Sequence, residues 1–426
     1  MTMIVFVGAL LLAMALGMPI AFALLASGVA LMWQLDLFDA QILTQNLIGG
    51  ADSFPLLAVP FFMLAGEVMN AGGLSRRIVH LALALVGHVR GGLGYVTIMA
   101  GCLLSALSGS AVADAAAHTA LLLPMMAAAG HGRARAGGLI AATGVIGPVI
   151  PPSIGLVIFG VAANVSISKL FLAAVAPGLL IGGALWVTWA WLVRREKIAP
   201  PPRRSAAEVW QAARAAGWAL LLPVIILVGL RMGVFTPTEA AVVAAVYALL
   251  VSTCIYRELS WRALYAVLVG AAKTSAVVMF LIAAAMVSAW LITVANLPAL
   301  VIEMVQPFIG QPLLLMLLIM LLVMVVGMAM DMTPTILILT PVLMPVVKAA
   351  GIDPVYFGVL FIINNSLGLI TPPVGVVLNV VAGVGKMRMD DVTRGVLPFM
   401  WAEFAMMFAM VLCPALVTVP ARWLGA

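Results

Sequence analysis

The segment 364–379 constrains the fold more than any other, because it places a helix-breaking sequence inside a long apolar run. It reads Asn-Asn-Ser-Leu-Gly-Leu-Ile-Thr-Pro-Pro-Val-Gly-Val-Val-Leu-Asn. Pro372 and Pro373 cannot continue the hydrogen bonds of a helix, so we expect unwound backbone at residues 368–373. Unwound backbone at membrane depth must face protein or a water-filled cavity. A broken helix of this kind indicates the binding site of a transporter.

The composition of the whole chain agrees with a membrane environment. It is 65% hydrophobic and 8% charged, whereas a soluble domain carries about 25% charged residues. The apolar runs are continuous rather than alternating, which favours helices over a β-barrel. Cys102, Cys254 and Cys413 lie far apart in apolar segments and are interpreted as small buried hydrophobic residues. We therefore predict an all-α polytopic membrane protein with no nucleic-acid partner, whose loop cations orient it in the lipid bilayer.

The predicted elements occur in the same order twice. Each half has a span, an interfacial helix, a hairpin, a broken span and a closing span. The predicted divisions are an N-terminal span (3–33, kinked at Gly17 and Pro19) and loop in 1–53, a first repeat in 54–193, a linker with two spans in 194–263, and a second repeat in 264–426. Hairpins are predicted at 94–130 and 312–350, broken helices at 137–163 and 355–385, interfacial helices at 74–90 and 297–309, closing spans at 170–193 and 396–419, and a hydrophilic linker at 194–214.

Two spacings support the repeat. Asp114 lies ten residues before Pro124 in the first half, and Asp331 lies ten residues before Pro341 in the second. The proline pair of each break is followed by another proline, 25 residues after its second member. If the linker is cytoplasmic, sixteen of the 21 Lys and Arg residues lie on that side, including six in the linker itself. The two hairpins then enter from opposite sides, so the repeats are inverted.

Asp114 and Asp331 are the sharpest candidates for function. A carboxylate at membrane depth is costly and is a functional hypothesis by default. Their equivalent places in the two halves strengthen that interpretation. Asp331 has an alternative role as the N-cap of the second arm of its hairpin.

Two cation sites are predicted where each hairpin tip faces a helix break. Both kinds of segment expose free carbonyl oxygens, and hydroxyl groups add to an oxygen-only environment that suits Na⁺. The residues of the first site are Ser108, Gly109, Ser110, Gly147 and Ser153, and those of the second are Gly327, Gly368, Thr371 and Val374. The substrate would be bound between them by Asp114, Asp331, Ser153, Pro152, Asn365 and Pro373. The alternative is that these small residues only permit close helix packing.

The remaining polar residues do not indicate a metal site, a catalytic site or a nucleotide site. The four histidines show no metal or catalytic-triad spacing, and the segment 383–386 lacks the spacing of a phosphate loop. Glu67 and Lys273 are intramembrane charges that pairing or snorkelling explains. An intramembrane enzyme is therefore not favoured.

Several motifs resemble those of the large membrane subunit of tripartite ATP-independent periplasmic (TRAP) transporters. The motifs are Ala65-Gly66-Glu67 before Gly72-Gly73, Ser108-Gly109-Ser110-Ala111, Gly147-Pro148-Val149-Ile150-Pro151-Pro152-Ser153, Gly327-Met328-Ala329-Met330-Asp331 and Gly368-Leu369-Ile370-Thr371-Pro372-Pro373-Val374-Gly375. The resemblance covers essentially the whole chain. It implies a bacterial inner-membrane permease, driven by a Na⁺ gradient, whose hairpins and broken helices slide as one body in an elevator motion.

The resemblance also implies partners. These are a small four-helix membrane subunit, expected as a separate chain, and a periplasmic binding protein that delivers an organic acid. We accordingly predict sodium symport of a small carboxylate, with two sodium sites at the tips and breaks. The alternative is a stand-alone ion-coupled carboxylate transporter of related fold that needs no binding protein.

Overall fold

The computed structural model describes residues 2–194 and 201–425, and every regular element in these residues is a helix. Nine helical stretches among the described residues are long and apolar enough to cross a membrane. The predicted all-α polytopic fold is therefore confirmed.

The first half contains α1 (Thr2–Ala15), α2 (Ile20–Gln34), α3 (Ala40–Ala51), η1 (Phe54–Leu57), α4 (Ala58–Ala71), α5 (Leu74–Val86), α6 (Gly92–Ser108), α7 (Ala111–Ala128), α8 (Arg133–Gly144), α9 (Ile154–Ala163) and α10 (Ile167–Val193). The second half contains α11 (Ala206–Arg231), α12 (Pro237–Leu250), η2 (Val251–Ile255), α13 (Trp261–Val294), α14 (Leu297–Ile309), α15 (Pro312–Ala329), α16 (Met332–Ala349), α17 (Pro354–Gly368), α18 (Val376–Gly385), α19 (Met389–Leu412) and α20 (Ala415–Leu424).

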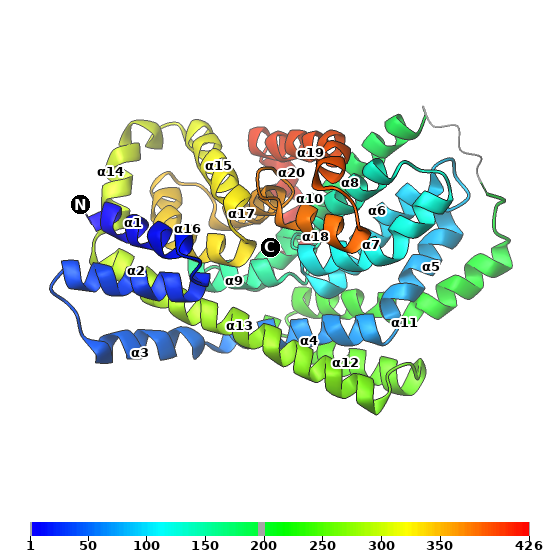
Figure 1. Cartoon of the computed structure of the whole chain (residues 1–426), viewed down its shortest axis with the longest axis horizontal. Helices are drawn as coiled ribbons and strands as arrows, with labels where there is room; N and C mark the ends of the chain where they lie inside the picture. Colours follow the sequence, from blue (N-terminus) through cyan, green and yellow to red (C-terminus); the bar gives the residue numbers. More distant parts are fainter. Residues whose placement is uncertain (1, 195–200, 426) are drawn as a thin grey trace.

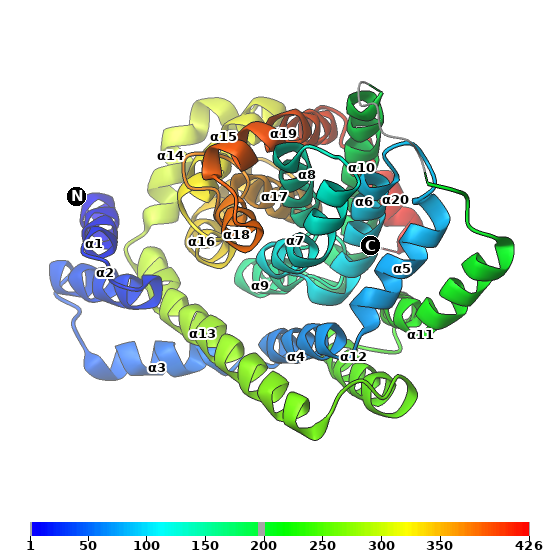
Figure 2. The same cartoon turned by 45° about the vertical axis from the view of Figure 1, so that its right-hand side comes forward.

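The helices form two groups that lie side by side (Figures 1 and 2). We call α1–α4 and α11–α13 the outer layer. The 34-residue α13 runs along this layer and packs on α2, α3 and α4. We call α6–α10 and α15–α20 the hairpin body, in which α8 packs on α19, α7 on α18, α15 on α17 and α9 on α16. Two arms, α5 and α14, connect the outer layer to the two hairpins.

The predicted hairpins and breaks are present in the body. Helices α6 and α7 are joined by a two-residue turn at 109–110, and α15 and α16 by a turn at 330–331. Non-helical backbone separates α8 from α9 at 145–153, and α17 from α18 at 369–375. The same order of elements therefore occurs in both halves.

The predicted first span is wrong, because residues 3–33 form two helices rather than one kinked helix. Helices α1 and α2 pack against each other, joined by a short turn (Figure 1). In that turn Gly17 has a left-handed φ of 79°, and Pro19 has no backbone N–H to donate to the preceding helix.

The predicted loop 34–53 also contains a helix, α3. Its N-cap is Asp39, whose carboxylate accepts a hydrogen bond from the Gln41 N–H at 2.7 Å.

Two other predicted boundaries are also wrong. The linker ends at Ser205 rather than at 214, because Ser205 and Glu208 form a capping box that starts α11. Residues 195–200 of the linker lie outside the described residues. The closing span predicted at 396–419 is α19, which begins at Met389 and ends at Leu412. Two aspartates in its first turn favour the earlier start, since negative charge stabilises a helix N-terminus.

Close backbone contact between α8 and α19 holds the hairpin body together. A Cβ atom on Gly395 would overlap the carbonyl oxygen of Ala134, and one on Gly138 would overlap the backbone of Gly395. These two helices therefore pack at a distance that only glycine permits.

Alanine at Gly395 should consequently lower the stability of the protein by about 1–3 kcal/mol, the usual cost of overpacking. The matched control is Gly183→Ala, because a Cβ on Gly183 of α10 would meet no atom within 4 Å. That change should be neutral or slightly stabilising, since alanine favours helices more than glycine does. Unfolding in detergent, followed by tryptophan fluorescence, measures both. Equal unfolding temperatures for the two variants would contradict this account of the α8–α19 contact.

Candidate functional site

The tip of the first hairpin lies directly against the first helix break. A Cβ atom on Gly109 would lie 2.9 Å from the carbonyl oxygen of Pro152. A Cβ on Gly147 would lie 2.7 Å from Oδ2 of Asp114 and 3.2 Å from the carbonyl carbon of Ser110. Gly109 therefore permits a close approach of backbone to backbone, and Gly147 permits the close approach of the Asp114 carboxylate. The structure brings the two halves of the predicted first cation site together.

Hydroxyl groups surround this contact. Ser108 Oγ donates a hydrogen bond to Asp114 Oδ1. Ser110 Oγ accepts from the Ala113 N–H at 3.4 Å and caps α7. Ser153 Oγ donates to the Pro148 carbonyl, and it accepts from the N–H that it caps at the start of α9. The serines thus place oxygen atoms at the tip and the break and also start the helices that follow.

Asp114 is the unusual group of this site. Its side chain is only 5% exposed, and Oδ2 has no hydrogen-bond partner among the described residues. That oxygen faces Gly147 in the break. A buried carboxylate oxygen without a partner is costly, and a cation bound at the tip would satisfy it. The available oxygens therefore fit a hard cation such as Na⁺.

The second hairpin tip contacts the second break in an equivalent way. A Cβ on Gly368 would lie 2.6 Å from the carbonyl carbon of Gly327 and 2.9 Å from its Cα. Asn365 is fully buried, and its Nδ2 donates to the Met332 carbonyl at 3.1 Å. Its Oδ1 has no hydrogen-bond partner among the described residues and would lie 3.0 Å from a Cβ on Gly327. A buried oxygen without a partner therefore lies at this tip as well.

The remaining residues of the predicted second site lie along the break. The Thr371 N–H donates to the Gly368 carbonyl at 3.0 Å, and its Oγ1 donates to the Leu367 carbonyl at 2.7 Å. Val374 is 40% exposed, and its carbonyl accepts from Asn379 Nδ2 at 2.8 Å. Gly327, Gly368 and Thr371 are thus close together, while Val374 lies further along the break. Their role as sodium ligands stays a prediction.

The residues predicted to bind substrate have different environments. Pro152 and Ser153 are buried in the first break, while Pro373 is exposed in the second. Asp331 is exposed and caps α16, accepting from the Met332 N–H at 2.8 Å. The capping alternative for Asp331 is therefore confirmed, and its contact with substrate stays a prediction.

Sequence reasoning missed one buried carboxylate. Glu403 of α19 is fully buried, and neither of its oxygens has a hydrogen-bond partner among the described residues. It is an acidic residue in a predicted span, which is a signal that could have identified it.

Glu67 and Lys273 are both exposed and form no ion pair in the part of the chain that the structure describes. Pairing therefore does not explain them.

Comparison with known proteins identifies the family of the chain. Residues 7–416 match the family described as the tripartite ATP-independent periplasmic transporter, DctM component. A relative from Escherichia coli K12, named the 2,3-diketo-L-gulonate TRAP transporter large permease protein YiaN, is 55% identical over all of both chains. The sialic acid TRAP transporter large permease protein SiaM of Vibrio cholerae is 40% identical, over 96% of both chains. The C4-dicarboxylate TRAP transporter large permease protein DctM of Pseudomonas aeruginosa is 37% identical, over 89% of both chains.

A solved structure shares the fold. The YdaH transporter from Alcanivorax borkumensis, whose structure was described as having an unusual topology, aligns with a TM-score of 0.63. The alignment covers 91% of this chain and 90% of that one, at 17% sequence identity. At this identity the likeness concerns the fold alone.

These relatives are transporter permeases and not enzymes, so the prediction that the chain is not an enzyme is confirmed. Their family and the apolar helices described above make it a multi-pass protein of the bacterial inner membrane. The resemblance found in the proline-containing motifs is also confirmed. The chain belongs to the DctM family, the large permease subunits of tripartite ATP-independent periplasmic transporters.

Proposed function

We propose that this permease imports a small organic carboxylate together with Na⁺. It would act with a small four-helix membrane subunit and with a periplasmic binding protein that delivers the substrate. The family match supports transport, and the three relatives described above are named for organic acids: a diketogulonate, sialic acids and C4-dicarboxylates.

The observation that carries sodium coupling is the unpartnered Oδ2 of Asp114. It lies at the contact between a hairpin tip and a helix break. The nearby oxygens are hydroxyl and carbonyl groups, which are the ligands that hard cations prefer. An ionised Asp114 would supply the negative charge that such a site needs. In this proposal Asp114 serves the first cation site rather than touching a carboxylate substrate, which it would repel.

Each tip–break contact would then act as a switch for substrate binding. Cation binding would hold the tip of α6–α7 against the break at 145–153, and the tip of α15–α16 against the break at 369–375. The substrate pocket between the tips would be complete only when both contacts are closed. Exposed Pro373 and Asp331 would lie at its rim. This order of events couples the sodium gradient to the carboxylate.

The two-group fold supports an elevator movement. The hairpin body contains both tips and both breaks, and the outer layer contains neither. The body would carry bound substrate across the membrane as one unit, with the long α13 as part of a stationary wall. The arms α5 and α14 would remain attached to both groups. The proposed inversion of the two repeats would give the pocket access to each side in turn.

Reconstituted uptake tests this function. The permease is placed in liposomes with the small subunit and the binding protein from the same genome, and a panel of radiolabelled acids beginning with 2,3-diketo-L-gulonate is offered outside. We expect uptake of one acid to require an inward Na⁺ gradient, and replacement of Na⁺ by choline to reduce it to the level of empty liposomes. Uptake that is unchanged in choline would refute sodium coupling.

Omitting one component at a time tests the partners. Uptake should be lost without the binding protein or without the small subunit. Full uptake in the absence of the binding protein would favour the alternative, a stand-alone ion-coupled carboxylate transporter.

A further inference from the structure

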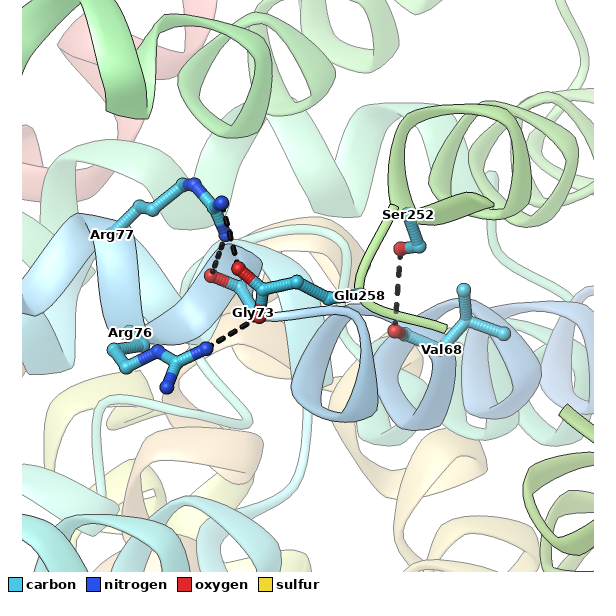
Figure 3. Close-up of polar contacts among 6 residues, drawn as sticks. All are labelled: Val68, Gly73, Arg76, Arg77, Ser252 and Glu258. Carbon is cyan, nitrogen blue, oxygen red and sulfur yellow. Dashed lines mark hydrogen bonds and ion pairs between the residues drawn. The ribbon is translucent and has the colours of Figure 1, made fainter. Parts of the chain in front are cut away.

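A cluster of polar contacts fixes the corner between α4 and α5 to the corner between α12 and α13 (Figure 3). The carboxylate of Glu258, which follows η2, pairs with Arg77 at 2.7 Å and also with Arg76. Arg77 donates a second hydrogen bond to the Gly73 carbonyl at 3.0 Å. Its guanidinium carbon lies 3.7 Å from the ring centroid of Tyr256. We call these five residues the corner clamp.

Two glycines allow the corners to meet. A Cβ atom on Gly72 would overlap Ser252 Oγ, which donates a hydrogen bond to the Val68 carbonyl at 3.5 Å. A Cβ on Gly73 would lie 2.7 Å from Cδ of Glu258. Gly73 also has a left-handed φ of 77°, which strains any other residue. The Gly72-Gly73 motif therefore brings the start of α5 into direct contact with η2 and Glu258.

Arg77 is the central cation of the clamp. Its side chain is 23% exposed, whereas that of Arg76 is 59% exposed. Solvent screens an exposed ion pair more strongly, so Arg76 contributes less. Partial burial opposes ionisation of Glu258, but hydrogen bonds and the charges of both arginines outweigh it and hold the pKa of that carboxyl below its usual value.

The chain just after α5 is fixed to the other group of helices. Trp189 of α10, in the hairpin body, donates from Nε1 to the Gly91 carbonyl at 2.9 Å. A Cβ on Gly94 would overlap the Trp189 indole, so the start of α6 packs closely on α10. Helix α5 packs on α11 of the outer layer and also on α6 of the hairpin body. Residues 87–90 connect the clamped arm to the start of α6, which Trp189 holds against α10. Gly87 lies at the start of this connection.

The second arm occupies an equivalent place but is attached differently. Asn296 precedes α14 with a left-handed φ of 54°, as Gly73 precedes α5. However, α14 buries only Leu297, whereas six residues of α5 are buried. Among the described residues, no ion pair joins α14 to another helix. The two arms thus differ in how firmly their first ends are held.

We infer that α5 stays with the outer layer during transport and that the hairpin body pivots at residues 87–90, with Arg77 and Glu258 as positioning residues that hold the arm. This inference rests on the elevator movement proposed above. Without the clamp, α5 would follow the body for part of the movement, and the body would no longer reach its end positions efficiently. The clamp would therefore affect the rate of transport and leave the affinity for Na⁺ unchanged.

Substitutions of the two arginines test the inference through uptake of the acid that the wild-type system transports best. We expect Arg77→Ala to lower the maximal rate of uptake about tenfold, since it removes an ion pair, a hydrogen bond and a ring contact together. The Na⁺ concentration for half-maximal uptake by this variant should equal that of wild type. Arg76→Ala is the matched control and should stay within about twofold of wild type. Arg77→Lys should be intermediate, because lysine keeps the charge but not the planar contacts.

Equal effects of the two alanine variants, or a shifted Na⁺ requirement in Arg77→Ala, would overturn the inference. Rates are normalised to monodisperse protein from gel filtration. If Arg77→Ala does not fold, Arg77→Lys decides: a rate equal to wild type would count against the clamp. The pair Arg77→Glu with Glu258→Arg should recover part of the rate lost in each single variant.

Spin labels test the movement itself. Cysteines replace the exposed His80 of α5 together with either Trp210 of α11 or Leu121 of α7. Cys254 and Cys413, which are exposed rather than buried as predicted, become serine. Between NaCl and choline chloride, the 80–210 distance should remain the same and the 80–121 distance should change. A change in the 80–210 distance would overturn the fixed arm. Two constant distances would instead contradict the elevator movement on which the inference rests.

Discussion

Alanine at Gly368 is expected to abolish uptake, with a rate at least about a hundredfold below wild type. A displacement of about 1 Å in the groups of a functional site can lower its rate by about that factor. The added Cβ would lie 2.6 Å from the carbonyl carbon of Gly327 and 2.9 Å from its Cα. Both atoms belong to the backbone, so no flexible side chain can move aside. The end of α17 and the tip of α15–α16 must separate, and the second cation site opens. Reconstituted uptake, with protein normalised by gel filtration, measures the loss.

The control for this prediction is Gly383→Ala in α18, where a Cβ would meet no atom within 4 Å. It should transport at the wild-type rate. Gly327→Ala should be less severe than Gly368→Ala, since its Cβ would meet the side-chain oxygen of Asn365 at 3.0 Å. If Gly368→Ala transports within about twofold of the control, the contact between tip and break is not needed for function.

Asparagine at Asp114 should raise the Na⁺ concentration for half-maximal uptake by about tenfold or more. In a buried site a cation interacts more strongly with a charged carboxylate than with a neutral amide. The substitution keeps the shape of the side chain and removes its negative charge. Ser108→Ala should raise the requirement less, since it removes only one hydrogen bond to Asp114. Uptake rates over a range of Na⁺ concentrations, at fixed ionic strength kept with choline, measure both changes.

The same experiment separates two roles for Asp114. A change confined to Na⁺ dependence places Asp114 in the first cation site. Unchanged Na⁺ dependence with a raised KM for the carboxylate would instead place it in the substrate site, as sequence reasoning predicts. His118→Gln is a suitable control, because His118 is buried one helical turn away on the same helix. It should affect Na⁺ dependence less than Asp114→Asn does.

The parts of the fold that could be predicted are those with local causes. Proline pairs at 151–152 and 372–373 mark the breaks, and small polar residues mark the first hairpin tip. The failures also have local causes. Gly17 and Pro19 are consistent with either a kink or a complete reversal of the chain, and only the packing of α1 on α2 distinguishes them. The capping box Ser205-x-x-Glu208 was present in the sequence and indicates where α11 begins.

The site was predictable in outline but not in detail. The repeated order of elements indicates which tip faces which break. It does not indicate that Gly368 meets Gly327 through the backbone, since this contact joins residues 41 positions apart. Nor does it indicate that Ser153 uses its hydroxyl to cap α9, because an N-cap serine and a cation ligand have the same residue type. The burial of Glu403 depends on every helix around α19 and has no local signal beyond its charge.

The length of α13 has a consequence for the membrane around the protein. Thirty-four helical residues extend for about 51 Å at the standard rise of a helix, whereas the hydrocarbon core of a bilayer is about 30 Å thick. An upright α13 would therefore project far into water, although its sequence is strongly apolar. A tilted α13 would keep more of this length inside the hydrocarbon core. Figure 2 shows α13 at an angle to α3 and α4. Trp261 and Tyr265, both exposed near one end, are suited to the headgroup region. A bilayer of different thickness should therefore change the tilt that α13 requires.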